Sequence, residues 1–168
     1  VVENQWMGRT LLNHIKTHKN ADRLTYCCPA EVVSVTPAEG GMRLDILMDN
    51  KTIQVSSDLV VMADGGRSEL RERLGISYQQ VVYEQHAVVA NISPEQPHQN
   101  IAYERFTDTG PLALLPLQDQ DDKARCGLVW TVPDEELENV MALDDNAFLA
   151  RVQERFGYRC GRFMHVGK

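Results

Sequence analysis

Apolar residues near the start of the chain recur at the spacing of an α-helix. Within residues 3–18, Trp6, Leu11, Leu12 and Ile15 form a partial apolar stripe among polar and basic neighbours. Residues three or four positions apart share one face of a helix. The pattern therefore predicts a helix over residues 3–18.

The next part of the chain has the pattern of β-structure. Residues 24–36 are rich in β-branched side chains, residues 42–48 alternate between apolar and polar, and residues 52–55 follow a tight turn. Turn-forming residues separate these stretches at 37–41 and 49–51. Consecutive strands joined by short turns predict an antiparallel meander.

A run of apolar residues without alternation follows at 59–63. Such a run is typical of a strand covered on both faces, as in a parallel sheet. The run meets an Asp-Gly-Gly turn, and the charged stretch after it ends at Leu74, next to Gly75. These signals predict a strand, a loop and a short helix in succession.

The second half of the chain combines strands with two helices. The predicted strands cover residues 79–92, 101–106, 112–117, 125–132 and 162–166. Pro133 and the acidic residues after it open a helix that runs to about Met141. A second helix starts at Asp144 or Asp145 and ends at Gly157.

A domain boundary is expected near Gly75, which gives one domain at residues 1–75 and another at 76–168. The first would be part of a nucleotide-binding domain, and the second a layer of antiparallel strands with two helices. The fold class is therefore α+β, a mostly antiparallel or mixed sheet with flanking helices.

The composition is that of an ordinary globular protein, with 43% apolar and 24% charged residues. This balance excludes a disordered chain. The formal net charge is −7 and no basic patch is sustained, so nucleic acid is not an expected partner. No apolar run approaches the about 20 residues that span a bilayer, and we expect a cytoplasmic protein.

No metal site is expected. His14 and His18 stand four apart on the predicted helix, a spacing that can hold a metal, but no Glu lies between them and lysines flank them, so a solvated face is the better interpretation. The acidic stretch 118–123 could bind calcium, yet its oxygen spacing favours a solvated turn. The cysteines lack the spacing of a zinc site and are expected to be reduced and packed; they are Cys27, Cys28, Cys126 and Cys160.

The turn at Asp64-Gly65 is the strongest candidate for binding. Glycines let a backbone approach a ligand closely, and free N–H groups at a helix start attract phosphate. Ser68 is a candidate N-cap, with Arg71 and Arg73 one turn on. The alternative is an ordinary turn that binds nothing.

Catalytic residues cannot be assigned from motifs. G-x-S-x-G, H-E-x-x-H and P-loop sequences are absent. Their absence is consistent with an enzyme whose cofactor carries the chemistry.

Several motifs together resemble a known family. Asp64-Gly65-x-x-Ser68-x-x-Arg71 resembles the Asp-Gly motif of the aromatic-ring flavoprotein hydroxylases, the group of para-hydroxybenzoate hydroxylase. Tyr-Glu-Gln at 83–85, Glu-Arg-Phe-Thr at 104–107 and Gly-Pro-Leu-Ala-Leu-Leu-Pro-Leu at 110–117 follow in order. Together they resemble the ubiquinone-biosynthesis branch, most closely its 2-polyprenyl-6-methoxyphenol hydroxylases.

The resemblance implies a fold, a reaction and partners. The chain would be the middle part of a para-hydroxybenzoate-hydroxylase-like fold. The intact protein would use FAD, NAD(P)H and O2 to hydroxylate a polyprenylated phenol. Because that substrate has a long apolar tail, contact with the inner membrane surface or with a ubiquinone-biosynthesis complex is also implied.

The resemblance also assigns roles by position. Around the cofactor diphosphates it places Asp64, Gly65, Ser68 and Arg71. Beside the substrate ring it places an apolar wall of Phe106, Pro111, Leu112 and Leu114. The alternative for the wall residues is that they are plain core residues of a strand.

Two departures from the family pattern qualify these roles. Met62 stands where the motif usually has a glycine, and neither a G-x-G-x-x-G nor the second, Gly-Asp flavin motif is present. We therefore expect an internal fragment that by itself neither holds FAD firmly nor hydroxylates a substrate. A sister hydroxylase acting at another ring position and a non-catalytic binding or assembly module are the alternatives.

Overall fold

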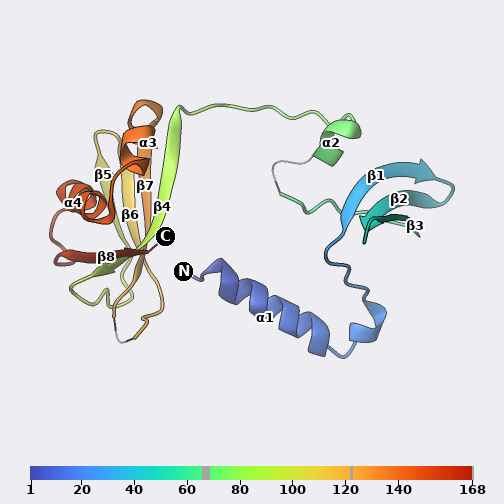
Figure 1. Ribbon diagram of the computed structural model, residues 1–168, viewed down its shortest axis with the longest axis horizontal. Coiled ribbons are helices and arrows are strands. Elements are labelled where there is room, and N and C mark those ends of the chain that lie inside the picture. The colour runs from blue at the N-terminus through green and yellow to red at the C-terminus, as the bar shows by residue number, and fades with distance from the viewer. Residues whose placement is uncertain (66–68, 122, 168) are drawn as a thin grey trace. The chain divides into compact units, whose positions relative to one another are not determined.

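The structure, a computed structural model, describes residues 1–65, 69–121 and 123–167 (Figure 1). Its contacts divide the chain into two compact units. Unit 1 comprises residues 1–16 and 82–168, and unit 2 comprises residues 17–81. The assignment of cofactor binding to a domain at 1–75 and of substrate binding to a domain at 76–168 stays a prediction.

Unit 1 is built on a five-stranded sheet in the order β5-β6-β7-β4-β8. Its strands are β4 (Gln85–Pro94), β5 (Tyr103–Thr107), β6 (Gly110–Pro116), β7 (Cys126–Pro133) and β8 (Phe163–Gly167). All of these strand pairs are antiparallel. The predicted fold class is thus confirmed in its main feature.

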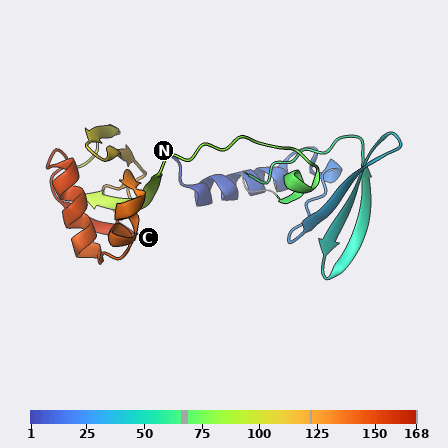
Figure 2. The same cartoon turned by 90° about the horizontal axis from the view of Figure 1, so that it is seen from above.

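Two helices, α3 (Asp134–Met141) and α4 (Asp145–Phe156), cover one face of this sheet (Figures 1 and 2). Every second residue of β7 points into the layer between sheet and helices, which explains its strictly alternating burial. The fully buried members of this core include Leu112, Leu114, Leu128, Trp130, Val132 and Val152. The core therefore depends on period-two strands that face period-3.6 helices.

Both helices begin and end where the sequence signals predicted. Pro133 is the N-cap of α3, and Asp144 is the N-cap of α4, where its side chain accepts a hydrogen bond of 2.8 Å from the Ala147 N–H. Gly157, with φ of +85°, ends α4, as an achiral residue can at little cost.

A helix at the N-terminal end, α1 (Asn4–Thr17), confirms the helix predicted for residues 3–18. The residues just before it are tied to the sheet of unit 1: the amino group of Val1 donates to the Pro116 carbonyl at 3.3 Å, and Arg125 pairs with Glu3 at 2.8 Å. The hydrogen bond from Arg125 holds the pKa of Glu3 below its usual value. Most apolar side chains of α1 are exposed, namely Trp6, Met7, Leu11 and Leu12, while Ile15 is half-buried.

Unit 2 contains the predicted antiparallel meander, in the order β1-β2-β3. The strands are β1 (Glu31–Ala38), β2 (Gly41–Met48) and β3 (Lys51–Ser57). A short 3-10 helix at Ala21–Arg23 precedes them, and the short helix α2 (Glu69–Arg73) follows. Val35, at 7% exposure, is the one hydrophobic residue of this unit that is buried among those the structure describes.

Three predicted strands differ from the structure. The first begins at Glu31 and not at residue 24, so that Cys27 and Cys28 lie in an irregular segment where they are exposed, not packed. Residues 59–63 form no strand, since no strand in the described ranges pairs with them. β4 begins at Gln85 and not at residue 79. In each case an apolar stretch lacks the neighbours whose N–H and C=O groups would complete a ladder.

The described chain contains no helix both long and apolar enough to cross a membrane.

Candidate functional site

The predicted cofactor residues lie in unit 2, around the turn at Asp64. Asp64 lines a hollow of about 470 Å³ between the meander, the segment 60–64 and α2. α2 is fastened to the meander by Arg73, which donates to the Val33 carbonyl at 2.8 Å and pairs with Glu69 at 3.0 Å. The short helix and the Asp64 turn thus form two walls of one hollow.

The chemistry of this hollow is acidic and hydrogen-bond accepting. Its ionised side chains are Glu31, Asp64, Glu69 and Arg73, of which the arginine is already held by Glu69. Three carboxylates repel phosphate, whereas carboxylates accept hydrogen bonds from hydroxyl groups. The described residues therefore fit the ribityl and ribose hydroxyls of a flavin nucleotide better than its diphosphate.

Gly65 is required by backbone conformation. Its φ is +86°, and a Cβ at this position would meet nothing within 4 Å. A residue with a side chain would be strained here because it rarely adopts this φ, and not because its Cβ would clash with neighbouring atoms. Among the described residues, Gly65 itself is exposed to solvent.

The remaining cofactor candidates lie at α2 or just before it. The guanidinium of Arg71 stacks over the Tyr78 ring at 4.0 Å, and Arg71 does not line the hollow. Ser68, the predicted N-cap, lies outside the described residues. The structure thus brings Asp64 to the hollow, with Gly65 next to it in the chain, and Arg71 is not part of its lining.

The predicted substrate residues lie in unit 1 and divide between the two faces of the sheet. Leu112 and Leu114 pair with Trp130 and Leu128, are 0% exposed and face α3 and α4 in the core. Phe106 pairs with Pro111 on the opposite face, where Phe106 is 78% exposed. Strand alternation imposes this division, so these four residues cannot form one wall.

We call the face of the sheet opposite the helices the open face. The strand register assigns to it the residues Ala87, Val89, Glu104, Phe106, Pro111, Ala113, Leu115, Val129 and Thr131. Val89 is 71% exposed and lies across from Val129. A broad apolar surface of this kind is typical of a binding or packing site. Sequence reasoning missed Val89 and Val129; the signal that could have found them is the alternation within β4 and β7.

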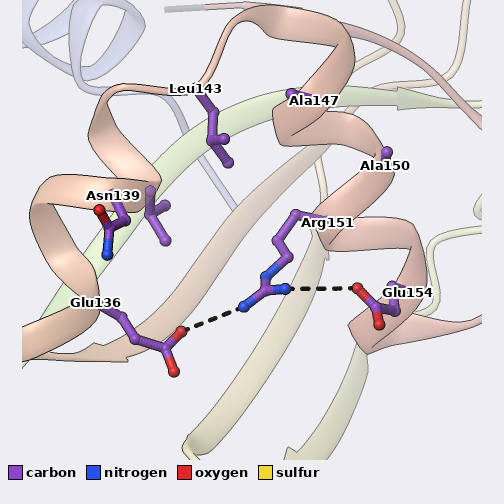
Figure 3. A pocket seen from close by; sticks show the side chains of 8 residues that line it. Glu136, Asn139, Leu143, Ala147, Ala150, Arg151 and Glu154 are labelled. Carbon is purple, nitrogen blue, oxygen red and sulfur yellow. Dashed lines mark ion pairs between the residues drawn. The ribbon is translucent and has the colours of Figure 1, made fainter.

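A second hollow lies on the helix side of unit 1, between α3 and α4 (Figure 3). There Arg151 lies between Glu136 and Glu154, with both N–O distances at 3.7 Å. Exposed ion pairs at such distances contribute little stability. Both glutamates of this groove are thus paired with Arg151, and no site residue predicted from the sequence lies in it.

Metal ligands do not gather in the structure. Within residues 1–65, 69–121 and 123–167, no three His, Cys, Asp or Glu side chains form a group that could hold a metal ion. His18 instead accepts a hydrogen bond of 3.2 Å from the Asn20 N–H through its Nδ1.

Comparison with known proteins gives consistent results. The sequence profile of a family described as FAD binding domain matches residues 8–160. The ubiquinone hydroxylase UbiL of Rhodospirillum rubrum is 32% identical over 167 residues, which cover 99% of this chain and 37% of UbiL. The human mitochondrial ubiquinone biosynthesis monooxygenase COQ6 is 33% identical over 137 residues, which cover 81% of this chain and 27% of COQ6.

An uncharacterized protein of Synechocystis, slr1300, is 33% identical over 84% of this chain and 33% of its own length. The chain thus spans about a third of the length of these relatives. Among solved structures, the flavin-dependent halogenase CmlS superposes with a TM-score of 0.69 at 17% identity, over 99% of this chain and 31% of the halogenase. At that identity the likeness is one of fold.

Proposed function

Because the chain belongs to the FAD-binding domain family, in its branch of ubiquinone-biosynthesis hydroxylases, we propose that the protein containing it hydroxylates the ring of a polyprenylated phenol. The profile match over residues 8–160 carries this proposal, together with two named ubiquinone-pathway relatives. The substrate we propose is a 2-polyprenyl-6-methoxyphenol, with NAD(P)H as reductant and O2 as oxidant.

The roles proposed for residues follow from their placement. Asp64 and Gly65 border the cofactor, with Arg71 beside them, and Asp64 accepts hydrogen bonds from the hydroxyl groups of the cofactor. Ser68, which lies outside the described residues, keeps the cofactor role that the family resemblance implies. Bound FAD would supply the redox chemistry, because no side chain of this set can carry electrons from NAD(P)H to O2. Phe106 and Pro111 contact the aromatic ring on the open face, while Leu112 and Leu114 support that face from the core.

The open face also fits the apolar tail of the substrate. Val89, Val129 and Ala113 add apolar side chains to the surface of Phe106 and Pro111, which thereby extends over β5, β6, β7 and β4. An isoprenoid chain gains free energy by leaving water for such a surface. Peripheral contact of the intact protein with the membrane that holds this substrate, or with a ubiquinone-biosynthesis complex, is part of the proposal.

The first experiment is a visible absorption spectrum. The full-length gene product and the 168-residue chain are purified identically, with an Asp64→Ala variant of the full-length protein and Asp58→Ala as the matched control. We expect flavin bands in the full-length protein, weaker bands in Asp64→Ala and bands of unchanged intensity in Asp58→Ala. The 168-residue chain should show no flavin bands. A full-length protein that is colourless and takes up no added FAD would overturn the proposal and favour a binding or assembly module.

The second experiment identifies the reaction. Oxidation of NADH and of NADPH is followed with and without a short-chain 2-prenyl-6-methoxyphenol, and the product is analysed by mass spectrometry and NMR. A gain of one oxygen on the ring supports the proposal. Hydroxylation only of a differently substituted phenol would identify a sister hydroxylase of the same pathway.

A further inference from the structure

A single carboxylate stands on the strands of the five-stranded sheet. Glu104 on β5 is the one acidic residue in β4, β5, β6, β7 and β8. It pairs with Ala113, and Phe106 lies two residues further along the same face. Its neighbour Arg105 points to the other face, where its guanidinium donates to the Phe156 carbonyl at 2.7 Å. Glu104 therefore belongs to the open face, beside the proposed ring contacts.

The carboxylate of Glu104 has no hydrogen-bond or ion-pair partner in the described part of the chain. Glu104 is exposed, whereas some other carboxylates of unit 1 are engaged: Glu3 pairs with Arg125 at 2.8 Å, and Asp108 pairs with Arg155 at 2.6 Å. The cross-strand neighbour Ala113 is too short to hide the carboxylate. A charged acceptor is thus presented on a face whose other assigned residues are uncharged and, apart from Thr131, apolar.

A phenol requires one strong acceptor beside an apolar surface. Its ring favours Phe106 and Pro111, while its O–H must donate to an acceptor when water is displaced. We propose that Glu104 accepts the hydrogen bond of the substrate's phenolic O–H and thereby fixes the position of the ring on the open face. This inference rests on the proposed function and adds a specificity residue to it.

Edge strands often carry charged residues that prevent pairing with other chains, and β5 is an edge strand. A charge that serves only this purpose would be indifferent to the hydroxyl group of a ligand. A comparison of two ligands therefore separates the two roles.

The test measures binding in the full-length protein by isothermal titration calorimetry. The ligands are a short-chain 2-prenyl-6-methoxyphenol and its O-methyl ether, which lacks the donor. The variants are Glu104→Gln, Glu104→Asp and, as the matched control, Glu138→Gln, which removes an exposed charge on α3. FAD content is recorded from the absorption spectrum of each sample.

Glu104→Gln should weaken binding of the phenol by roughly tenfold or more, the size expected for a hydrogen bond to a charged group, and change binding of the ether by less than about twofold. Glu104→Asp should restore part of the phenol affinity, and Glu138→Gln should change neither ligand. Equal effects on both ligands, or none on the phenol, would overturn the proposal. A wild-type protein that holds FAD but does not bind the phenol overturns it as well, whereas absence of FAD points to failure of the proposed function itself.

Discussion

Two leucines and a phenylalanine on neighbouring strands show how a sheet sorts similar residues into different environments. Leu112 and Leu114 are 0% exposed, while Phe106 is 78% exposed. All three are apolar, so hydrophobicity alone does not separate them. Their position in the register does, because adjacent residues of a strand point to opposite faces.

This division predicts opposite effects of truncation. Leu114→Ala should lower the free energy of unfolding by about 2–5 kcal/mol, because it leaves a cavity in a packed core. Phe106→Ala should change it by less than about 0.5 kcal/mol but weaken substrate binding. Urea denaturation and ligand titration of both variants measure the two effects. A Leu114→Ala variant that keeps its free energy of unfolding but loses substrate affinity would contradict this prediction and indicate that Leu114 contacts the substrate.

The four thiols are predicted to divide by reactivity. Burial raises the pKa of Cys126 to about 11 and also raises the pKa of Cys160, so neither forms a thiolate near neutral pH. Cys27 and Cys28 are exposed. A chromogenic disulfide reagent should label two thiols quickly in the folded chain and all four in denaturant. Cys27→Ser is the control and should show one fast-reacting thiol, with the labelled residues identified by mass spectrometry. Fast labelling of Cys126 would contradict this.

At the scale of elements, local signals were predicted well and pairing partners were not. The start of α4 at Asp144 and its end at Gly157 depend on residues within one turn, which a sequence displays directly. The apolar run at 59–63 has strand composition, but a strand also needs a neighbour to hydrogen-bond with, and none is present in the residues that the structure describes. Amino-acid composition predicts which secondary structures a segment can adopt, and the presence of a neighbouring strand decides whether it forms a strand.

The pairing of Glu3 with Arg125 should make the attachment of α1 depend on pH. The pKa of Glu3 is lower in the folded chain than in the unfolded one, so its stabilisation is present above the ordinary pKa of a glutamate and is lost as the pH falls through the lower, folded value. The difference in urea midpoint between wild type and Glu3→Gln should therefore shrink as the solution is acidified. Glu138→Gln serves as the control, and a constant difference would contradict the pairing.

At the scale of the whole molecule, the two units differ in how much core they possess. Unit 1 buries a continuous cluster that includes Trp130, Phe148 and Val152, while in the described part of unit 2 Val35 is the one buried hydrophobic residue. Regions with few buried apolar contacts open more readily. The meander should consequently exchange its amide hydrogens faster than β7.

Limited proteolysis should reveal this difference. Residues 76–83 have no regular structure, and Tyr83 is 81% exposed. Chymotrypsin should cut there early and leave a fragment that begins at Glu84 and contains the sheet, identifiable by mass spectrometry. Tyr83→Ser should slow that cut selectively. Early cleavage within residues 85–156 would contradict the assignment of the stable unit.

The sequence predicted which segments contribute to the candidate site, but not which face of the sheet their side chains occupy. The Asp64 turn was found from its own residues, since Gly65 and the charged helix after it are adjacent in the chain. The open face joins residues of four strands, some of which are tens of positions apart, such as Val89 and Val129. Their proximity comes from strand register, which a single sequence states only weakly.

The bond between Glu3 and Arg125 has a consequence for how the molecule assembles and evolves. It joins positions 122 residues apart, and the whole of unit 2 is inserted between them. A ribosome makes Glu3 long before Arg125, so this contact must wait for β7. The unfavourable free energy of closing a flexible loop, which is entropic, rises by only about 0.6 kcal/mol for each doubling of the loop length. Insertions and deletions within residues 17–81 are therefore cheap for unit 1, and the two units are free to diverge at different rates.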